Sequence, residues 1–165
     1  MNTKTTVIEQ DQLEEQFAFC DKIAAFWQTC GRTPTAYVET YGCQQNEADS
    51  EKLRGYLAQS GYRIAGSAEG ADVVVMNTCS IREHAEQRVF GNLGALTHTK
   101  RRHPEQKIFL CGCMAGETKV SDRIKKSFPY VDGVFSTHHL WQFPEILYNV
   151  LTKKKRQFYI EDEAG

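Results

Sequence analysis

Hydrophobic and polar positions follow two different periods along the chain. Residues 71–78 (ADVVVMNT) and 107–114 (KIFLCGCM) are almost continuously apolar, as expected for strands that are buried on both faces of a sheet. Shorter segments with β-forming residues predict further strands at 36–41, 62–66 and 131–137. Apolar residues spaced three or four apart predict helices at 11–30, 46–61, 80–102, 115–128 and 139–151.

Strands that alternate with helices predict right-handed crossovers and a parallel sheet covered on both faces. We therefore expect an α/β fold: a three-layer sandwich around a doubly wound, flavodoxin-like sheet of five strands in the order 2-1-3-4-5. Three units are predicted, namely an N-terminal helical extension (1–34), the α/β domain (35–152) and the start of a linker (153–165). No packing partner is predicted for the tail after residue 156.

Composition and charge narrow the class of protein. The chain has 165 residues, 41% hydrophobic and 25% charged, with a net charge of −1, so it is not a polyanion binder over its whole surface. Basic residues cluster at 100–103 (KRRH) and 153–156 (KKKR). A solvated surface is the favoured interpretation of these clusters, and an RNA-facing patch with Lys100, Arg101 and Arg102 is the alternative.

The same sequence predicts a cytoplasmic protein with no membrane and no DNA partner. No apolar stretch approaches the roughly 18 residues of a membrane span, and the N-terminus lacks the apolar core of a secretory signal. Cytoplasmic thiols stay reduced, so six cysteines suggest metal binding or catalysis. The GxGxxG and GxxxxGK[ST] loops of nucleotide-binding proteins do not occur.

Three of the cysteines follow predicted strands. Cys43 follows the first strand, Cys79 the third, and Cys113 ends the fourth. These strands are neighbours in the order 2-1-3-4-5, so the three thiols are expected within roughly 10 Å of one another at the carboxyl edge of the sheet, where such folds bind ligands. Cys20 and Cys30 are interpreted as small, half-buried hydrophobic residues.

Three thiolates are compatible with several kinds of site. Three thiolates suit a cubane iron–sulfur cluster with one iron left free. A zinc site would need a fourth ligand such as Cys111 or His84, and a catalytic cysteine would need a histidine such as His138 or His139. Polar residues expected to surround the site, as hydrogen-bond donors to sulfur or as helix caps, are Asn46, Asn77 and Ser80.

Three motifs, YGCQQNEADSEKL, NTCSIREHAEQRVFGNLG and CGCMAG, resemble the N-terminal domain of the radical-SAM methylthiotransferases, in the branch that modifies tRNA. The resemblance runs from about Ala36 to Leu151. It implies that Cys43, Cys79 and Cys113 bind an auxiliary [4Fe–4S] cluster that donates sulfur. Where the family usually has methionine, lysine and glutamine near this site, the chain has other residues: Gln45, His84 and Gly116.

The resemblance also implies parts that this chain does not contain. The family uses a CxxxCxxC motif to bind a second [4Fe–4S] cluster, which cleaves S-adenosylmethionine, and no such spacing occurs among the six cysteines. The expected partners are the radical-SAM and TRAM domains of the same protein and a tRNA, whose N6-isopentenyladenosine next to the anticodon receives a methylthio group at C2. We expect this chain alone to be inactive. The alternative is a zinc-binding or partner-binding module of flavodoxin-like fold.

Overall fold

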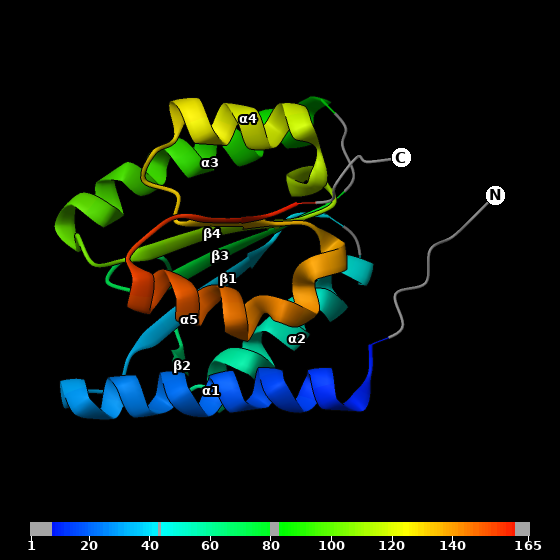
Figure 1. Cartoon of the computed structure of the whole chain (residues 1–165). Coiled ribbons are helices and arrows are strands. Elements are labelled where there is room, and N and C mark those ends of the chain that lie inside the picture. The colour runs from blue at the N-terminus through cyan, green and yellow to red at the C-terminus, as the bar shows by residue number, and fades with distance from the viewer. Residues whose placement is uncertain (1–7, 43, 80–82, 161–165) are drawn as a thin grey trace.

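The computed structural model describes residues 8–42, 44–79 and 83–160, and it is organised around one parallel sheet (Figure 1). The strands are β1 (Thr35–Thr40), β2 (Arg63–Ile64), β3 (Val73–Thr78), β4 (Lys107–Gly112), β5 (Gly133–Phe135) and β6 (Gln157–Tyr159). Their order in the sheet is β2-β1-β3-β4-β5-β6, and every neighbouring pair is parallel. The predicted α/β class and the order 2-1-3-4-5 are confirmed, but the predicted number of five strands is wrong because β6 adds a sixth.

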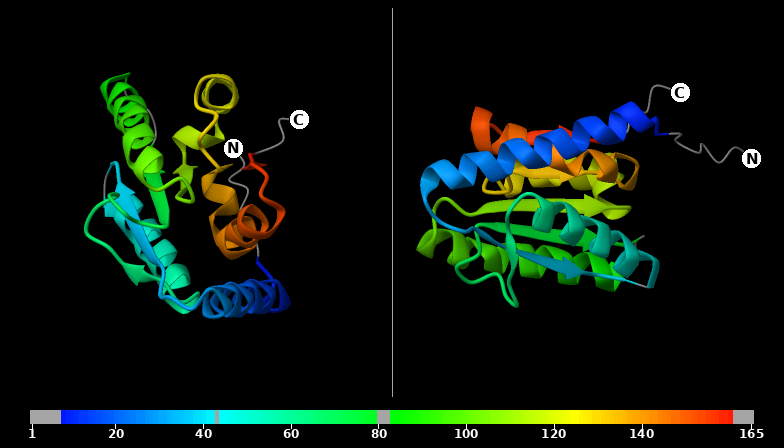
Figure 2. Two further views of the ribbon diagram at one scale, coloured as in Figure 1. Left: turned by 90° about the vertical axis from the view of Figure 1, so that its left-hand side faces the viewer. Right: turned by 90° about the horizontal axis from the view of Figure 1, so that it is seen from below.

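Helices cover both faces of the sheet. They are α1 (Gln10–Cys30), α2 (Gln44–Gln59), α3 (Glu83–Arg102), α4 (Thr118–Ser127) and α5 (Phe143–Lys153), with short 3-10 helices η1 (Met114–Gly116) and η2 (Thr137–Gln142). Figures 1 and 2 show α3 and α4 on one face and α2 and α5 on the other, with α1 lying outside α2 and α5. The predicted three-layer sandwich is therefore present, and α1 covers one side of it.

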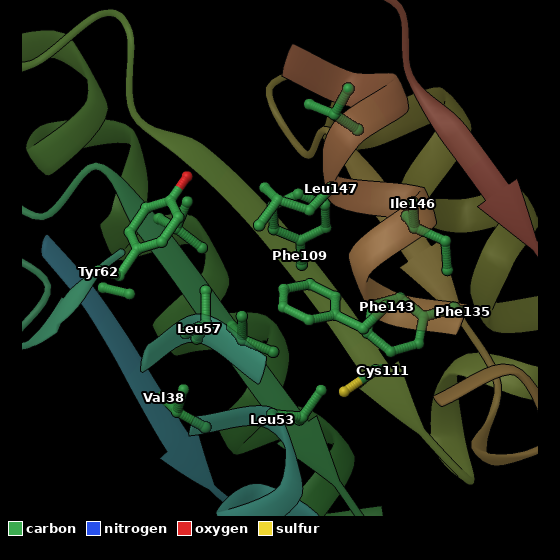
Figure 3. Close-up of a cluster of buried hydrophobic side chains, with 14 of the residues drawn as sticks. Val38, Leu53, Leu57, Tyr62, Phe109, Cys111, Phe135, Phe143, Ile146 and Leu147 are labelled. Atoms are coloured by element: carbon green, nitrogen blue, oxygen red, sulfur yellow. The ribbon is translucent and has the colours of Figure 1, made fainter. Parts of the chain in front are cut away.

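The core has two halves because side chains alternate along each strand. Phe109 and Cys111 of β4 face α2 and α5, where they pack with Leu53 and Phe143 (Figure 3). The alternate residues of β4 face α3 and α4. Burial on both faces explains the continuous apolar runs, since every position in the strand lies in one of the two halves. Each fully buried large side chain contributes about 1.5–3 kcal/mol of transfer free energy.

The tail after residue 156 pairs with the sheet, contrary to the prediction that it has no packing partner. The Gln157 N–H donates to the Asp132 carbonyl, and the Ser136 N–H donates to the Tyr159 carbonyl. The Tyr159 hydroxyl also donates to Glu145 of α5. Residues 157–159 form a strand because β5 would otherwise present unpaired backbone groups at the edge of the sheet.

Helix α1 is held against the domain by polar contacts at two places. The Gln16 amide donates to the Glu145 carboxylate, and the Gln16 side-chain oxygen accepts from the Glu145 backbone N–H at the start of α5. Near the other end of α1, the Trp27 indole donates to the Tyr62 hydroxyl at 2.8 Å. Within the described ranges, no helix is both long enough and apolar enough to cross a membrane.

Candidate functional site

Two of the predicted site cysteines lie directly after neighbouring strands at the carboxyl edge of the sheet. Thr78 of β3 is paired with Gly112 of β4, and Cys79 and Cys113 are the next residues along each strand. The two cysteines therefore leave β3 and β4 at the same level of the sheet. Cys43, the third predicted ligand, lies outside the described residues.

The backbone just before Cys43 lies against Cys79. Gly42 has a φ of +135°, a conformation that L-residues with a side chain rarely adopt. A Cβ at Gly42 would overlap the Cβ of Cys79 and would lie 3.0 Å from its Sγ. Only glycine allows the chain that follows β1 to approach the chain that follows β3 so closely.

Gly112 has the same role one strand further along. Its φ is +103°, and a Cβ there would overlap the Thr78 carbonyl oxygen and lie 2.8 Å from the Thr78 nitrogen. Neither glycine was predicted from the sequence as part of the site. The signal was present, since each directly precedes a cysteine in the segments YGC and CGC.

The thiols at this edge differ in exposure. Cys113 is exposed, with its Sγ 3.6 Å from the Thr137 hydroxyl at the start of η2, and Cys79 is partly exposed. Cys111, by contrast, is fully buried in the half of the core under α2 and α5. Burial raises the pKa of the Cys111 thiol well above its ordinary value. Cys111 is therefore a protonated core residue, which makes it a poor thiolate ligand.

A buried amide network joins the start of α2 to the end of β3. The Asn77 side-chain amide donates to the Asn46 carbonyl at 2.9 Å and to the Ser50 hydroxyl at 3.0 Å. The Asn46 side-chain amide donates to the Thr78 carbonyl at 2.8 Å. The Asn77 side-chain oxygen accepts from the Cys111 thiol at 3.7 Å. These bonds hold the backbone on both sides of the site in one arrangement.

The predicted surrounding residues are thus only partly brought together. Asn46 and Asn77 lie next to each other, while Ser80 lies outside the described residues. The prediction that Asn46 precedes the helix as its cap is wrong, because α2 begins at Gln44 and Asn46 belongs to its first turn. From that position its side chain reaches across to β3.

The end of β5 contributes a serine and a threonine, Ser136 and Thr137, that were not predicted from the sequence. Ser136 is buried, and its hydroxyl has no hydrogen-bond partner among the residues that the structure describes. It directly precedes Thr137, the residue next to Cys113. His139, considered above as a partner of a catalytic cysteine, has its Nδ1 2.7 Å from the Gln142 side-chain oxygen.

The predicted RNA-facing residues lie at the other edge of the sheet. They end α3, which returns from the carboxyl edge to the start of β4, about 20 Å away by the rise of a six-residue strand. Lys100 donates to the Asp132 carboxylate and to the Tyr130 carbonyl, both at 2.7 Å. Arg102 pairs with Glu69, and Arg101 is exposed. An RNA contact there stays a prediction, although the ammonium group of Lys100 is already paired within the domain.

Among the described residues, no three His, Cys, Asp or Glu side chains gather closely enough to hold a metal ion. Cys43 is not one of these residues, because it lies outside the described ranges. The described part of the chain places Cys79 and Cys113 at this edge, with the backbone of Gly42 next to Cys79.

Comparison with known proteins gives one family and many relatives. The model of a family described as uncharacterized protein family UPF0004 matches residues 35–136. A tRNA-2-methylthio-N(6)-dimethylallyladenosine synthase of Clostridioides difficile is 35% identical over 98% of this chain and 35% of its own length. Synthases of the same name from Clostridium perfringens (48% identical over 69% of this chain) and Caldicellulosiruptor saccharolyticus (45% over 81%) are also similar. The chain spans only about a quarter to a third of the length of these relatives.

Proposed function

The chain belongs to the UPF0004 family, and from this premise we propose that it is the part of a tRNA methylthiotransferase that binds a sulfur-donating [4Fe–4S] cluster. The proposed ligands are Cys43, Cys79 and Cys113. One observation carries the proposal: Cys79 and Cys113 leave adjacent strands at the same level, and the residue before Cys43 lies against Cys79.

The residues at the carboxyl edge fit such a group. Thiolates are the ligands that iron–sulfur clusters prefer, and Cys79 and Cys113 both retain exposure at the edge. Gly42 and Gly112 let the backbone segments approach one another where side chains would prevent it. The buried hydroxyl of Ser136 and the exposed hydroxyl of Thr137 add polar groups beside Cys113. Cys111 remains a core residue and leaves the ligand set at three.

When bound, a cluster held by three thiolates supplies one iron without a protein ligand, which can carry sulfur for transfer. The chain's own residues would fix the three thiols around that position. Asn46 and Asn77 would hold the start of α2 against the end of β3 and so maintain the separation of Cys43 from Cys79. The fully buried β3 and β4 strands provide the rigid support beneath them.

We also propose the activity of the longer protein from the names of the relatives. It would add a methylthio group at C2 of N6-dimethylallyladenosine next to the anticodon of a tRNA, in the cytoplasm. The relatives are three to four times longer than the matched region, which leaves room for radical-SAM and TRAM domains, a second [4Fe–4S] cluster and S-adenosylmethionine. This chain by itself would assemble the auxiliary cluster and not catalyse the reaction.

Anaerobic reconstitution with iron and sulfide tests the proposal. We expect about four iron and four sulfide ions per chain and a broad absorption near about 400 nm. Cys79→Ala should lose most of both. The control Cys30→Ala changes an exposed cysteine at the end of α1 and should keep them. Tightly bound zinc with no cluster would contradict the proposal and favour a zinc-binding module.

A further inference from the structure

A groove opens between α3 and α4, on the face of the sheet opposite the amide network. It has a volume of about 720 Å³. Helix α3 contributes Glu86, Gln87, Phe90 and Gly91, and α4 contributes Lys119 and Arg123. The volume lies within the range of about 300–1,000 Å³ that is typical of small-ligand sites, so one nucleotide fits.

The groove begins at the same edge as the candidate cysteine site. Glu86 and Gln87 lie in the first two turns of α3, the helix that follows Cys79 along the chain. Lys119 is the second residue of α4, which follows Cys113 after the short helix η1. Figure 1 shows α3 and α4 side by side above the sheet. A ligand that extends from the cysteine edge over this face would therefore enter the groove.

The wall of the groove carries a stacked arginine. The Arg123 guanidinium lies 3.9 Å from the centre of the Phe90 ring and 5.9 Å from the centre of the Phe128 ring, and the two ring centres are 5.4 Å apart. Phe90 is almost fully buried, whereas Arg123 is exposed. The stack therefore presents a flat, positively charged surface. Arginine planes and aromatic rings are the groups on which proteins stack unpaired RNA bases.

The charge of the groove suits an anionic ligand. Neither Lys119 nor Arg123 forms an ion pair with any residue of the described ranges, and Glu86 is the one acidic side chain among the described residues of the lining. This contrasts with Lys100 and Arg102 at the opposite edge, which are both paired with carboxylates. Among the described residues, Lys119 and Arg123 thus add two cations without an ion pair on the cysteine side of this face.

Gly91 keeps the groove open. It lies in the interior of α3, where glycine is less favourable than alanine, and a Cβ placed on it would meet nothing within 4 Å. Since neither a close contact nor an unusual backbone angle requires glycine there, the helix tolerates a larger residue at this position. A side chain at residue 91 would fill part of the groove that a ligand would use.

We propose that this groove binds one unpaired base of an RNA loop, with the base stacked on Arg123 and a neighbouring phosphate next to Lys119. The inference rests on the proposed function, because that function supplies RNA as the ligand. It adds a position on the domain for a nucleotide other than the one that reacts at the cysteine edge.

Fluorescence anisotropy with a short stem-loop RNA that carries N6-dimethylallyladenosine in its loop tests this proposal, at one fixed salt concentration. Arg123→Ala and Gly91→Leu should each weaken binding about tenfold. Arg123→Lys keeps the charge but not the plane and should lose most of the same affinity. The controls Arg101→Ala and Gly94→Leu, which change the opposite edge and a glycine of α3 outside the groove, should stay within about twofold.

An equal loss of RNA affinity for Arg101→Ala, or unchanged RNA affinity for Gly91→Leu, would overturn the proposal and leave the groove to a protein partner. Absence of binding by the unaltered chain would overturn it too. Iron content of the same preparations separates this failure from failure of the proposed function, since Gly91 and Arg123 are not among the proposed ligands. The fluorescence of a 2-aminopurine placed in the loop should change on binding to the unaltered chain and not on addition of Gly91→Leu.

Discussion

Replacement of Asn77 by alanine should lower the free energy of unfolding by more than the loss of one hydrogen bond. The Asn77 side chain is fully buried and joins β3, which Cys79 follows, to α2, which Cys43 precedes. It donates to the Asn46 carbonyl and to the Ser50 hydroxyl, both on α2, and accepts from the Cys111 thiol on β4. Asn77→Ala removes all three bonds and leaves their partners inside the protein.

The expected cost follows from what remains unpaired. A buried donor or acceptor left without its partner costs about 1–3 kcal/mol. The Ser50 hydroxyl keeps its hydrogen bond with the Thr40 hydroxyl at 2.7 Å, so loss of the Asn77 bond to Ser50 costs an amount at the low end of this range. The bond from the Cys111 thiol is weak at 3.7 Å and adds little. We therefore expect about 2–4 kcal/mol in total. This is a large share of the 5–15 kcal/mol that is typical for the unfolding of a domain.

Urea unfolding of the apo chain, followed by circular dichroism, measures this cost. The matched control is Asn92→Ala, which removes one half-buried hydrogen bond to the Tyr41 hydroxyl at 2.7 Å and should cost about 0.5–1.5 kcal/mol. Reconstituted Asn77→Ala should also release iron to a chelator faster than the control. A loss of stability no larger than that of Asn92→Ala would refute the reasoning, since the network would then not support the site.

Three further predictions concern the edge, the acid response and the thiols. Gly112→Ala should cost at least about 3 kcal/mol in the free energy of unfolding, because it forces a Cβ into a left-handed position against backbone; a melting temperature equal to that of the unaltered chain would contradict this. Burial raises the pKa of Asp72, but hydrogen bonds from Arg32, the backbone and His103 outweigh it and hold that pKa below its ordinary value. The ionised Asp72 carboxylate therefore stabilises the fold fully above about pH 4, and this stability is lost as pH falls through the lower folded pKa. Asp72→Asn should make the free energy of unfolding depend less steeply on pH in the acid range, and an unchanged dependence would contradict the prediction. Cys111, buried and with a raised pKa, should react with a maleimide only on unfolding, whereas Cys113 should react in the native chain. Mass spectrometry of the labelled peptides measures the order of reaction, and labelling of Cys111 before Cys113 would contradict the prediction.

The strand order was predictable because five strands that alternate with helices fit a known doubly wound arrangement, the flavodoxin-like order 2-1-3-4-5. Continuous apolar runs marked β3 and β4 as central strands, and alternation with helices indicated a parallel sheet. Once the order was known, the position of the cysteines in the sequence placed Cys79 and Cys113 at one edge, and the register of Thr78 with Gly112 agrees. The position of each cysteine directly after a predicted strand was enough to place both thiols at one edge, without knowledge of any contact.

The sixth strand could not be predicted in the same way. Residues 157–159 are half-buried and show no strong alternation, so their own sequence does not distinguish a strand from a linker. They are strand because β5 is short and leaves backbone groups for them to pair with. Such pairing depends on which edge is open after the rest of the sheet has formed, a property that no local pattern contains.

The amino-acid sequence by itself indicated the class of fold, a doubly wound strand order and the edge of the sheet at which Cys79 and Cys113 lie, since burial periodicity and the alternation of strands with helices carry this information. Only the tertiary structure decided that Gly42 and Gly112 let the chain approach so closely, that Asn77 bonds to α2, and that α3 and α4 leave a groove beside Arg123. These features join residues far apart in the sequence. The physical reason is that close approach and hydrogen bonding depend on distances set by packing, whereas periodicity records only which side of an element is buried.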